Sequence, residues 1–226
     1  MNWKEVWQNK EPKMLDDLET LLENDGFDSC GGDINAEAWL NYNKEITRIA
    51  GIKPKESIYE VGCGSGAFLY PFYKRGHNVG GIDYANKQIS MCKILFNGDF
   101  ETGEAKQLDY MTSYDNVLSF SVFQYFPDLD YASEVLNRMM TKAKERVLIL
   151  DIPDIELKER AEAERRALDP DYDIRYKDLK HLYYDKEWFY DMCLDYDNNQ
   201  SFEIFYHTLP GYPNSQYRYS VVIGKP

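Results

Sequence analysis

The sequence is poor in basic residues and contains no run of them. Its 226 residues include 26 Lys and Arg against 39 Asp and Glu, which gives a formal net charge of −13. Non-specific affinity for nucleic acids comes from Lys and Arg side chains that neutralise phosphates. The composition therefore argues against a broad nucleic-acid-binding surface, and we expect no nucleic-acid partner.

Patterns typical of metal sites, secretion signals and membrane spans are also missing. The cysteines form no CxxC pair and no zinc-type Cys/His spacing, so we expect no metal site and reduced thiols in a cytoplasmic protein. The first residues, MNWKEVWQNKEPK, lack the apolar core of a signal peptide. No apolar run approaches the roughly 18 residues of a membrane span, so we expect no membrane partner. The four cysteines are Cys30, Cys63, Cys92 and Cys193.

Apolar and aromatic residues are abundant, at 43% and 15% of the chain. This is enough for a sizeable core, and the length predicts a single domain over residues 1–226. Residues 1–50 are predicted to be helical. Trp3 and Trp7 lie one helical turn apart, and helical spacing of apolar residues resumes at 36–50.

From residue 56 onward, short apolar strands alternate with helices, which is the pattern of βαβ units. The alternation predicts an α/β fold with a doubly wound, mostly parallel sheet that carries helices on both faces. The predicted strands are 57–61, 78–82, 100–105, 116–121 and 146–151, and the predicted helices between them are 66–74, 85–96 and 131–144.

The alternation is interrupted after the fifth strand, so that residues 152–226 differ in character from residues 51–151. A charged helix at 156–168 is followed by an irregular, tyrosine-rich segment at 169–184. The last two strands are joined by a short Pro/Gly-rich link, and a parallel crossover would need about a dozen residues. The chain is therefore predicted to close with an antiparallel pair. The remaining predicted elements are a helix at 185–194 and strands at 202–209 and 217–223.

A glycine-rich loop, Glu60-Val61-Gly62-Cys63-Gly64-Ser65-Gly66, ends the first strand and precedes the first helix of the alternating part. Glycines let the backbone turn sharply and allow a ligand to approach it closely. Two cofactor classes fit this position. Gly62, Gly64 and Ala67 have the dinucleotide-binding spacing, with Asp83 about 20 residues later, where a ribose-binding acid belongs. Glu60 favours the other class, because it would repel a pyrophosphate but could engage a cationic amine.

Over about residues 40–226 the sequence resembles the class I S-adenosylmethionine-dependent methyltransferases. Their first motif is an acid-x-Gly-x-Gly-x-Gly turn, matched here by residues 60–66. Their seven-stranded sheet closes with an antiparallel last strand, whereas a dinucleotide-binding sheet normally continues parallel. The resemblance implies S-adenosylmethionine as cofactor. It also implies cofactor contacts from Glu60, Gly62, Cys63, Gly64, Gly66, Asp83, Tyr84, Glu104, Ala105 and Ser119.

The resemblance also suggests what these contacts do. The glycine loop would lie beneath the methionine part of the cofactor, and Asp83 would hold both ribose hydroxyls. Glu104 would lie beside the adenine, although an aspartate is commoner there. The motif at 114–125 would end under the transferable methyl group.

For the acceptor, the resemblance implies a helical lid from residues 1–50 and a cover from the insert after the fifth strand. His181, at the end of the insert, is the candidate general base, because histidine is easily poised as a base at neutral pH. His77 and His207 are expected to be structural. The candidate substrate contacts are Trp39, Tyr42, Phe123, Gln124, Tyr125 and Tyr184.

The sequence thus predicts an S-adenosylmethionine-dependent methyltransferase that modifies an oxygen or nitrogen of a small molecule. The 19 tyrosines, weighted toward the insert and the last strands, hint at the acceptor pocket. Two alternatives stay open: a protein or nucleic-acid methyltransferase, and a catalytically silent cofactor-binding partner subunit. No feature indicates an oligomeric state.

Overall fold

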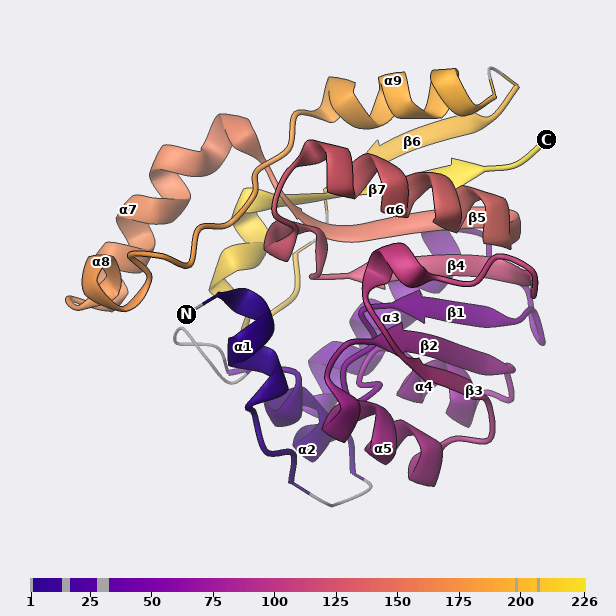
Figure 1. Cartoon of the computed structure of the whole chain (residues 1–226), viewed down its shortest axis with the longest axis horizontal. Helices are drawn as coiled ribbons and strands as arrows, with labels where there is room; N and C mark the ends of the chain where they lie inside the picture. Colours follow the sequence, from indigo (N-terminus) through magenta and orange to yellow (C-terminus); the bar gives the residue numbers. More distant parts are fainter. Residues whose placement is uncertain (1, 14–16, 28–32, 198, 207) are drawn as a thin grey trace.

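The computed structural model describes residues 2–13, 17–27, 33–197, 199–206 and 208–226. It contains a seven-stranded sheet in the order β3-β2-β1-β4-β5-β7-β6 (Figure 1). β7 runs antiparallel to both of its neighbours, and the other pairs are parallel. The predicted doubly wound sheet with an antiparallel last strand is confirmed. The strands are β1 (Ile58–Val61), β2 (Val79–Asp83), β3 (Asp99–Thr102), β4 (Tyr114–Phe120), β5 (Ala143–Pro153), β6 (Ser201–Phe205) and β7 (Arg218–Gly224).

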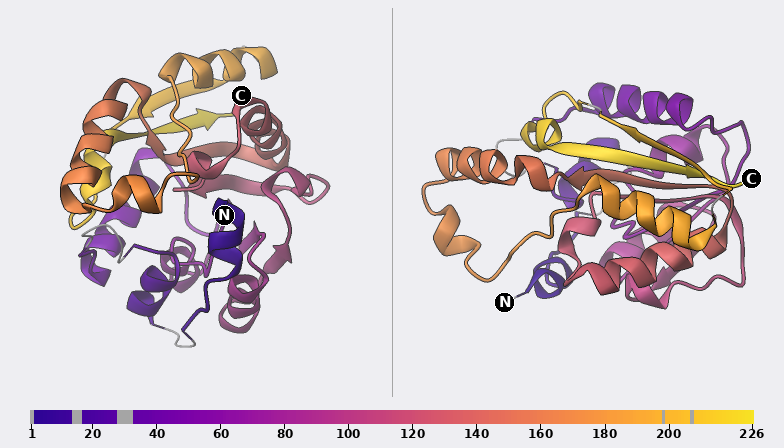
Figure 2. Two further views of the ribbon diagram at one scale, coloured as in Figure 1. Left: turned by 60° about the vertical axis from the view of Figure 1, so that its left-hand side comes forward. Right: turned by 90° about the horizontal axis from the view of Figure 1, so that it is seen from above.

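Helices cover both faces of the sheet, and each face has its own apolar core. α3, α4 and α5 pack on one face, with Trp39, Phe68 and Phe72 in its core. α6 and α9 pack on the other, around Phe123 and Phe189 (Figure 2). The α-helices are α1 (Trp3–Gln8), α2 (Leu18–Asn24), α3 (Ala36–Ile49), α4 (Tyr70–Lys74), α5 (Asn86–Leu95), α6 (Leu129–Lys142), α7 (Lys158–Leu168), α8 (Tyr172–Arg175) and α9 (Lys186–Tyr196), and the 3-10 turns are η1 (Ala105–Gln107), η2 (Phe123–Tyr125), η3 (Ile155–Leu157) and η4 (Pro213–Tyr217).

The burial of the strands explains why the sheet sits at the centre. Every residue of β1 is buried, and residues of β4 alternate between the two cores, with Val117 facing one and Leu118 the other. A strand covered on both faces reads as a continuous apolar run, as expected for a parallel sheet. The helices need only one apolar side each, and α6 buries Val135, Leu136 and Met139.

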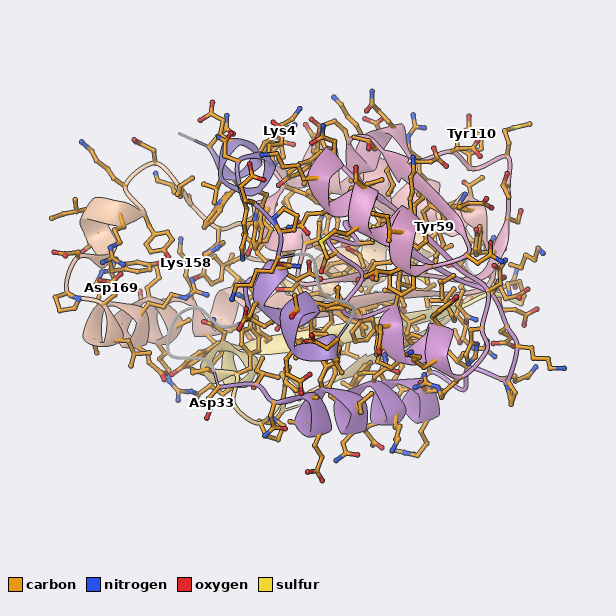
Figure 3. All side chains as sticks on the ribbon, turned by 90° about the horizontal axis from the view of Figure 1, so that it is seen from below. Lys4, Asp33, Tyr59, Tyr110, Lys158 and Asp169 are labelled. Atoms are coloured by element: carbon orange, nitrogen blue, oxygen red, sulfur yellow. The ribbon has the colours of Figure 1, made fainter. Side chains whose placement is uncertain are left out.

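Two segments stand beyond the carboxyl ends of the parallel strands. The insert that follows β5, with α7 and α8, extends to one side of the sheet, and Lys158 and Asp169 mark its helical part (Figure 3). α1 lies at the same end of the molecule (Figure 1). These segments add side chains to the edge where a doubly wound sheet binds its ligands.

The structure corrects several predicted boundaries. The helix predicted at 66–74 begins at Tyr70, because the glycine loop continues as turns, and Pro71 lies in its first turn. The strand predicted at 100–105 ends at Thr102. The segment 169–184 contains the short helix α8. Among the described residues, no helix is long and apolar enough to cross a membrane. Cys30 and His207 lie outside the described residues.

Candidate active site

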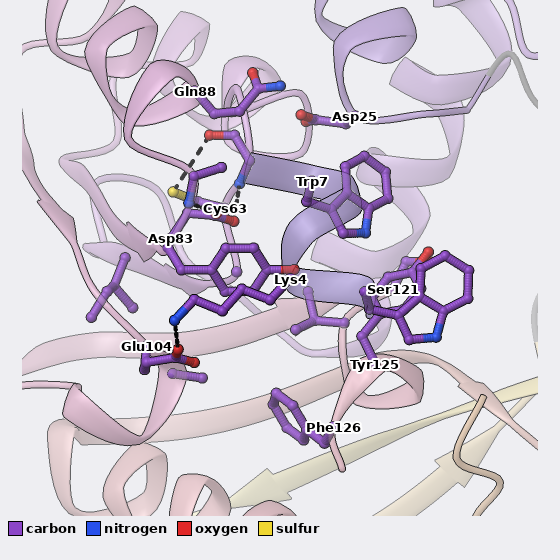
Figure 4. A pocket seen from close by; sticks show the side chains of 18 of the residues that line it. Lys4, Trp7, Asp25, Cys63, Asp83, Gln88, Glu104, Ser121, Tyr125 and Phe126 are labelled. Carbon is purple, nitrogen blue, oxygen red and sulfur yellow. Dashed lines mark hydrogen bonds and ion pairs between the residues drawn. The ribbon is translucent and has the colours of Figure 1, made fainter. Parts of the chain in front are cut away.

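A cavity of about 710 Å³ opens at the carboxyl ends of β1, β2 and β4 (Figure 4). Its volume lies within the range of pockets that hold small molecules. The glycine loop and the end of β2 form one side, and α1 crosses it with Trp3, Lys4 and Trp7. The segment 177–180 of the insert completes the wall. Three parts of the chain that are far apart in sequence therefore meet around one space.

The glycine loop has a backbone that only glycine adopts without strain. Gly62 has a φ of 76° and Gly64 a φ of 52°, both in the left-handed region. A Cβ atom at Gly62 would collide with the side chain of Val122, and one at Gly64 with the carboxylate of Asp25. The loop therefore needs glycine both for its turns and for its neighbours.

Asp83, at the end of β2, holds the loop in place and also lines the cavity. Its two carboxylate oxygens accept hydrogen bonds from the backbone N–H groups of Gly64 at 3.0 Å and Ala85 at 2.7 Å. Burial raises the pKa of this carboxyl above its usual value, and these two hydrogen bonds oppose the rise. A carboxylate has about four acceptor positions, so two hydrogen bonds leave capacity for ribose hydroxyls.

Three buried polar atoms that line the cavity have no hydrogen-bond partner among the described residues. They are Nε1 of Trp7, Oε2 of Glu60 and Oε1 of Gln88. Buried polar atoms are normally paired, so a group of unpaired ones around one cavity indicates a polar ligand. Burial, followed by the charge of Asp25, raises the pKa of Glu60 well above its usual value.

Asp25, which follows α2, was not identified from the sequence. Its carboxylate accepts hydrogen bonds from the backbone N–H groups of Ser65 at 2.6 Å and Ala67 at 3.1 Å. Burial raises the pKa of Asp25 to about 7. The dipeptide Asn24-Asp25 followed by glycine indicates only a turn, so no local signal could have revealed this contact.

The remaining predicted cofactor residues divide into two groups. Cys63, Tyr84, Glu104 and Ala105 line the cavity. Glu104 also pairs with Lys4 of α1 and accepts a hydrogen bond from the Tyr131 hydroxyl at 3.2 Å. Two predicted residues are not among the lining residues: Ser119 donates its hydroxyl to the Val61 carbonyl at 2.9 Å, and Gly66 packs against Phe96.

Of the predicted substrate residues, only Tyr125 lines the cavity. Its ring lies 4.8 Å from that of Trp3 and 5.8 Å from that of Trp7, so the three rings form an aromatic wall. The other predicted contacts are buried elsewhere. Trp39 and Tyr42 pack on the sheet rather than in a lid, and Trp39 donates to the Ala67 carbonyl. Phe123 and Tyr184 belong to the core covered by α6 and α9, and Gln124 is buried and donates its amide to the Ser121 carbonyl at 2.7 Å.

His181 lies behind the aromatic wall. Its ring stacks on Trp3 at 4.8 Å with an interplanar angle of 17°. The guanidinium of Arg165 lies 3.0 Å from Nδ1, and because arginine can only donate, Nδ1 accepts. Burial, followed by the charges of Arg165 and Arg218, lowers the pKa of His181 well below its usual value. His181 is therefore neutral, and its single basic lone pair, on Nδ1, is already engaged, which favours a positioning role over that of a general base.

The described residues include no group of three or more His, Cys, Asp or Glu side chains that could hold a metal ion. Cys63 and Cys92 lie near the glycine loop, and the Cys92 thiol is 3.4 Å from the Gly64 carbonyl. Burial raises the pKa of the Cys63 thiol well above its usual value. A protonated, buried thiol is a poor nucleophile, which agrees with a packing role.

The strand order, the antiparallel β7 and the glycine loop at the end of β1 are those of the class I S-adenosylmethionine-dependent methyltransferase fold. Residues 59–149 match the profile of a methyltransferase domain family. Two solved structures show the same fold over most of the chain. Magnesium protoporphyrin IX methyltransferase of Synechocystis, with bound S-adenosylmethionine, has a TM-score of 0.59 at 16% identity and covers 95% of this chain and 100% of its own. An amino pentose methyltransferase of Micromonospora echinaspora, also with bound S-adenosylmethionine, has a TM-score of 0.62 at 12% identity, over 83% and 92%.

Two curated proteins are similar over shorter stretches. An uncharacterized protein of Haemophilus influenzae is 26% identical over 119 residues, which are 49% of this chain and 42% of that protein. A ubiquinone biosynthesis O-methyltransferase of Pelagibacter ubique is 24% identical over 97 residues, 40% of each chain. The chain therefore spans about two fifths of the length of the curated relatives it matches.

Proposed function

We propose that this protein transfers a methyl group from S-adenosylmethionine to an oxygen or nitrogen atom of a small molecule. The observation that carries the proposal is the set of unpaired polar atoms around the cavity beside the glycine loop. Glu60 offers an unpaired carboxylate oxygen and Gln88 an unpaired amide oxygen, both suited to an ammonium group. Trp7 offers an unpaired N–H donor for a carboxylate. The methionine part of the cofactor carries both an ammonium and a carboxylate group.

The cofactor, when bound, supplies an electrophilic methyl group on its sulfonium. The chain would contribute binding and alignment, which can lower the barrier by several kcal/mol. Asp83 would receive the ribose hydroxyls, and Tyr84, Glu104 and Ala105 would surround the adenine. Trp3 and Tyr125 would keep water from the acceptor, and the aromatic faces would tolerate the sulfonium charge.

The size and wall of the cavity favour a small acceptor. Trp3 and Trp7 of α1 cross the cavity, so a long polymer would have to displace this helix. The net charge of −13 disfavours a polyanionic substrate. Protein and nucleic-acid substrates and a silent partner subunit remain the alternatives that the experiments below separate.

Calorimetric titration with S-adenosylhomocysteine tests the cofactor site. We expect binding by the unmodified protein and a loss of affinity of at least about tenfold in Asp83→Ala, because ribose contacts of a buried carboxylate are strong hydrogen bonds. Asp185→Ala is the matched control, since Asp185 also accepts a backbone N–H, from Glu187, but lies outside the cavity. Absence of binding by the unmodified protein would refute the proposal.

The acceptor atom is tested by incubation with S-adenosylmethionine and candidate small molecules, peptides and RNA. Mass spectrometry of the products identifies the methylated atom. Methylation of peptides or RNA in preference to small molecules would support the first alternative. Cofactor binding without any methylated product would support the silent subunit.

A further inference from the structure

The two sides of the cavity differ in their ionisable side chains. The cofactor side is lined by acids from the loop after α2, from β1, from β2 and from the loop after β3. The insert side is lined by Lys177 and Lys180, with Asp178 as its one acid among the lining residues. A cationic cofactor accounts for the acidic side, but it does not account for the lysines. The four acids of the cofactor side are Asp25, Glu60, Asp83 and Glu104.

A buried arginine adds to the positive side. Arg165 of α7 is 7% exposed, and its hydrogen bonds go to neutral groups: Asn214 Oδ1 at 3.1 Å, His181 Nδ1 at 3.0 Å and the Tyr183 hydroxyl at 3.4 Å. Among the described residues it has no ion pair within 4.0 Å. A buried charge without a countercharge is costly, so an anion is expected nearby.

A second buried arginine does not remove this excess. Arg218 lies 3.8 Å from the carboxylate of Asp151 and donates to its carbonyl at 3.1 Å. Burial raises the pKa of Asp151, and the charges of Arg218 and Arg165 oppose this rise. One carboxylate thus faces two guanidinium groups, and Glu164 and Asp169 line the separate cavity beside Arg165.

The positive charge lies directly behind the aromatic wall. Arg165 contacts His181, whose neutral ring stacks on Trp3. The indole N–H of Trp3 donates to the Lys180 carbonyl at 3.0 Å, which fixes the wall to the lysine-bearing segment. An aromatic wall alone could bind either a flat ring or an ammonium group. The guanidinium behind it and the lysines beside it disfavour an ammonium group.

We propose that the acceptor is a molecule with a flat aromatic ring that also carries an anionic group such as a carboxylate. Its ring would pack on Trp3, Trp7 and Tyr125, and its anion would face Lys177 and Lys180. This inference rests on the proposed function and narrows its substrate class.

A matched set of three phenols tests the charge preference: 3-(4-hydroxyphenyl)propanoate, its amide and 3-(4-hydroxyphenyl)propylamine. Binding is measured by tryptophan fluorescence in the presence of S-adenosylhomocysteine, since Trp3 and Trp7 line the cavity. We expect the carboxylate to bind at least about tenfold more tightly than the amide, and the amine to bind most weakly. A preference for the amine, or no difference among the three, would overturn the proposal.

Single substitutions test which side chains produce the preference for the carboxylate. Lys180→Met is expected to weaken binding of the carboxylate by about threefold to tenfold and to leave the amide unchanged, because only the charge is removed. Arg165→Gln is expected to weaken binding of the carboxylate and not of the amide. Arg165→Lys, which keeps the charge, is expected to retain part of the preference for the carboxylate. Lys44→Met is the control: Lys44 is an exposed lysine of α3 outside the cavity lining.

Folding and cofactor binding are controlled separately. Each variant is titrated with S-adenosylhomocysteine, and an unchanged affinity shows that the cofactor site is intact. If Arg165→Gln does not fold, the exposed Lys180 still carries the test. Equal losses for carboxylate and amide in Lys180→Met would overturn the assignment of the anion to this side. If the unmodified protein does not bind S-adenosylhomocysteine, the proposed function itself is refuted.

Discussion

The carboxylate of Asp25 accepts a 2.6 Å hydrogen bond from the backbone N–H of Ser65, within the glycine loop. A segment that precedes the sheet therefore touches the loop that would hold the methionine part of the cofactor. Burial, and after it the charge of Asp25, raises the pKa of Glu60, so the two acids disfavour each other's ionisation in the free protein. A cationic ligand would relieve this repulsion, which links cofactor binding to the docking of the α2 segment.

The first prediction concerns the pH dependence of stability. The pKa of Asp25 is about 7 in the folded protein against an ordinary value of 3.8. Its contribution to the free energy of unfolding is therefore fully present below pH 3.8 and is lost as the pH rises through about 7. We expect urea denaturation across this range to show the unmodified protein losing stability relative to Asp25→Asn. A difference in the free energy of unfolding between the two proteins that does not change with pH would contradict a raised pKa of Asp25.

The second prediction separates backbone strain from contact in the glycine loop. Gly64 (φ 52°) and Gly51 (φ 63°) both have left-handed backbones, but only Gly64 has a neighbour, Asp25, where a Cβ would lie. Alanine at either position should cost about 1–2 kcal/mol of backbone strain. We expect Gly64→Ala to lose more stability than Gly51→Ala and also to lose affinity for S-adenosylhomocysteine. Equal losses at both sites would show that the contact with Asp25 is unimportant.

The third prediction is that Glu60→Gln changes stability and affinity in opposite directions. Glu60 is buried with one oxygen unpaired, and its ionised form is disfavoured in the free protein. Removing the charge should raise the melting temperature of the free protein. The same change should weaken S-adenosylhomocysteine binding by about tenfold through loss of a charge-assisted contact.

The control for this substitution is Glu203→Gln, at an exposed position of β6. It should leave both quantities unchanged. A Glu60→Gln protein that binds the cofactor with full affinity would remove Glu60 from the proposed site.

The fourth prediction tests the role of His181. Because Nδ1 of His181 accepts from Arg165, an asparagine amide oxygen can take over this hydrogen bond. We expect His181→Asn to retain turnover within about fivefold, whereas loss of a general base would cost about 10²–10⁴. His181→Ala should raise KM more than it lowers kcat, because the support of Trp3 is lost. A 100-fold fall in kcat of His181→Asn would restore the general-base role.

More of the predicted residues line the cavity on the side of the glycine loop than on the side of the insert, for a physical reason. The glycine loop is local: seven consecutive residues contain the turn, and its position between a strand and a helix follows from periodicity. Asp83 could be placed for the same reason, since it ends the next strand along the chain. The side chains that complete this side from elsewhere, such as Asp25 and Gln88, carry no local signal.

The acceptor side depends on chain paths that periodicity does not describe. Trp39 and Tyr42 were expected in a lid, but the apolar side of α3 packs on Phe68 and Phe120 of the sheet core. η2 directs Tyr125 toward the cavity and Phe123 toward α9. Which residue of a short turn faces a ligand is decided by the elements packed against it, not by its position in the sequence.

α1 is fastened at both sides of the cavity, through Lys4 to Glu104 and through Trp3 to the Lys180 carbonyl. A cofactor beneath α1 and an acceptor beside it would both enter and leave past this helix. Exchange of either ligand would therefore require the same two contacts of α1 to break. We expect detachment of the six-residue helix α1 to be one conformational step that limits the exchange of both ligands. The rate at which this helix detaches, rather than the rate of methyl transfer, would then set the upper limit on kcat.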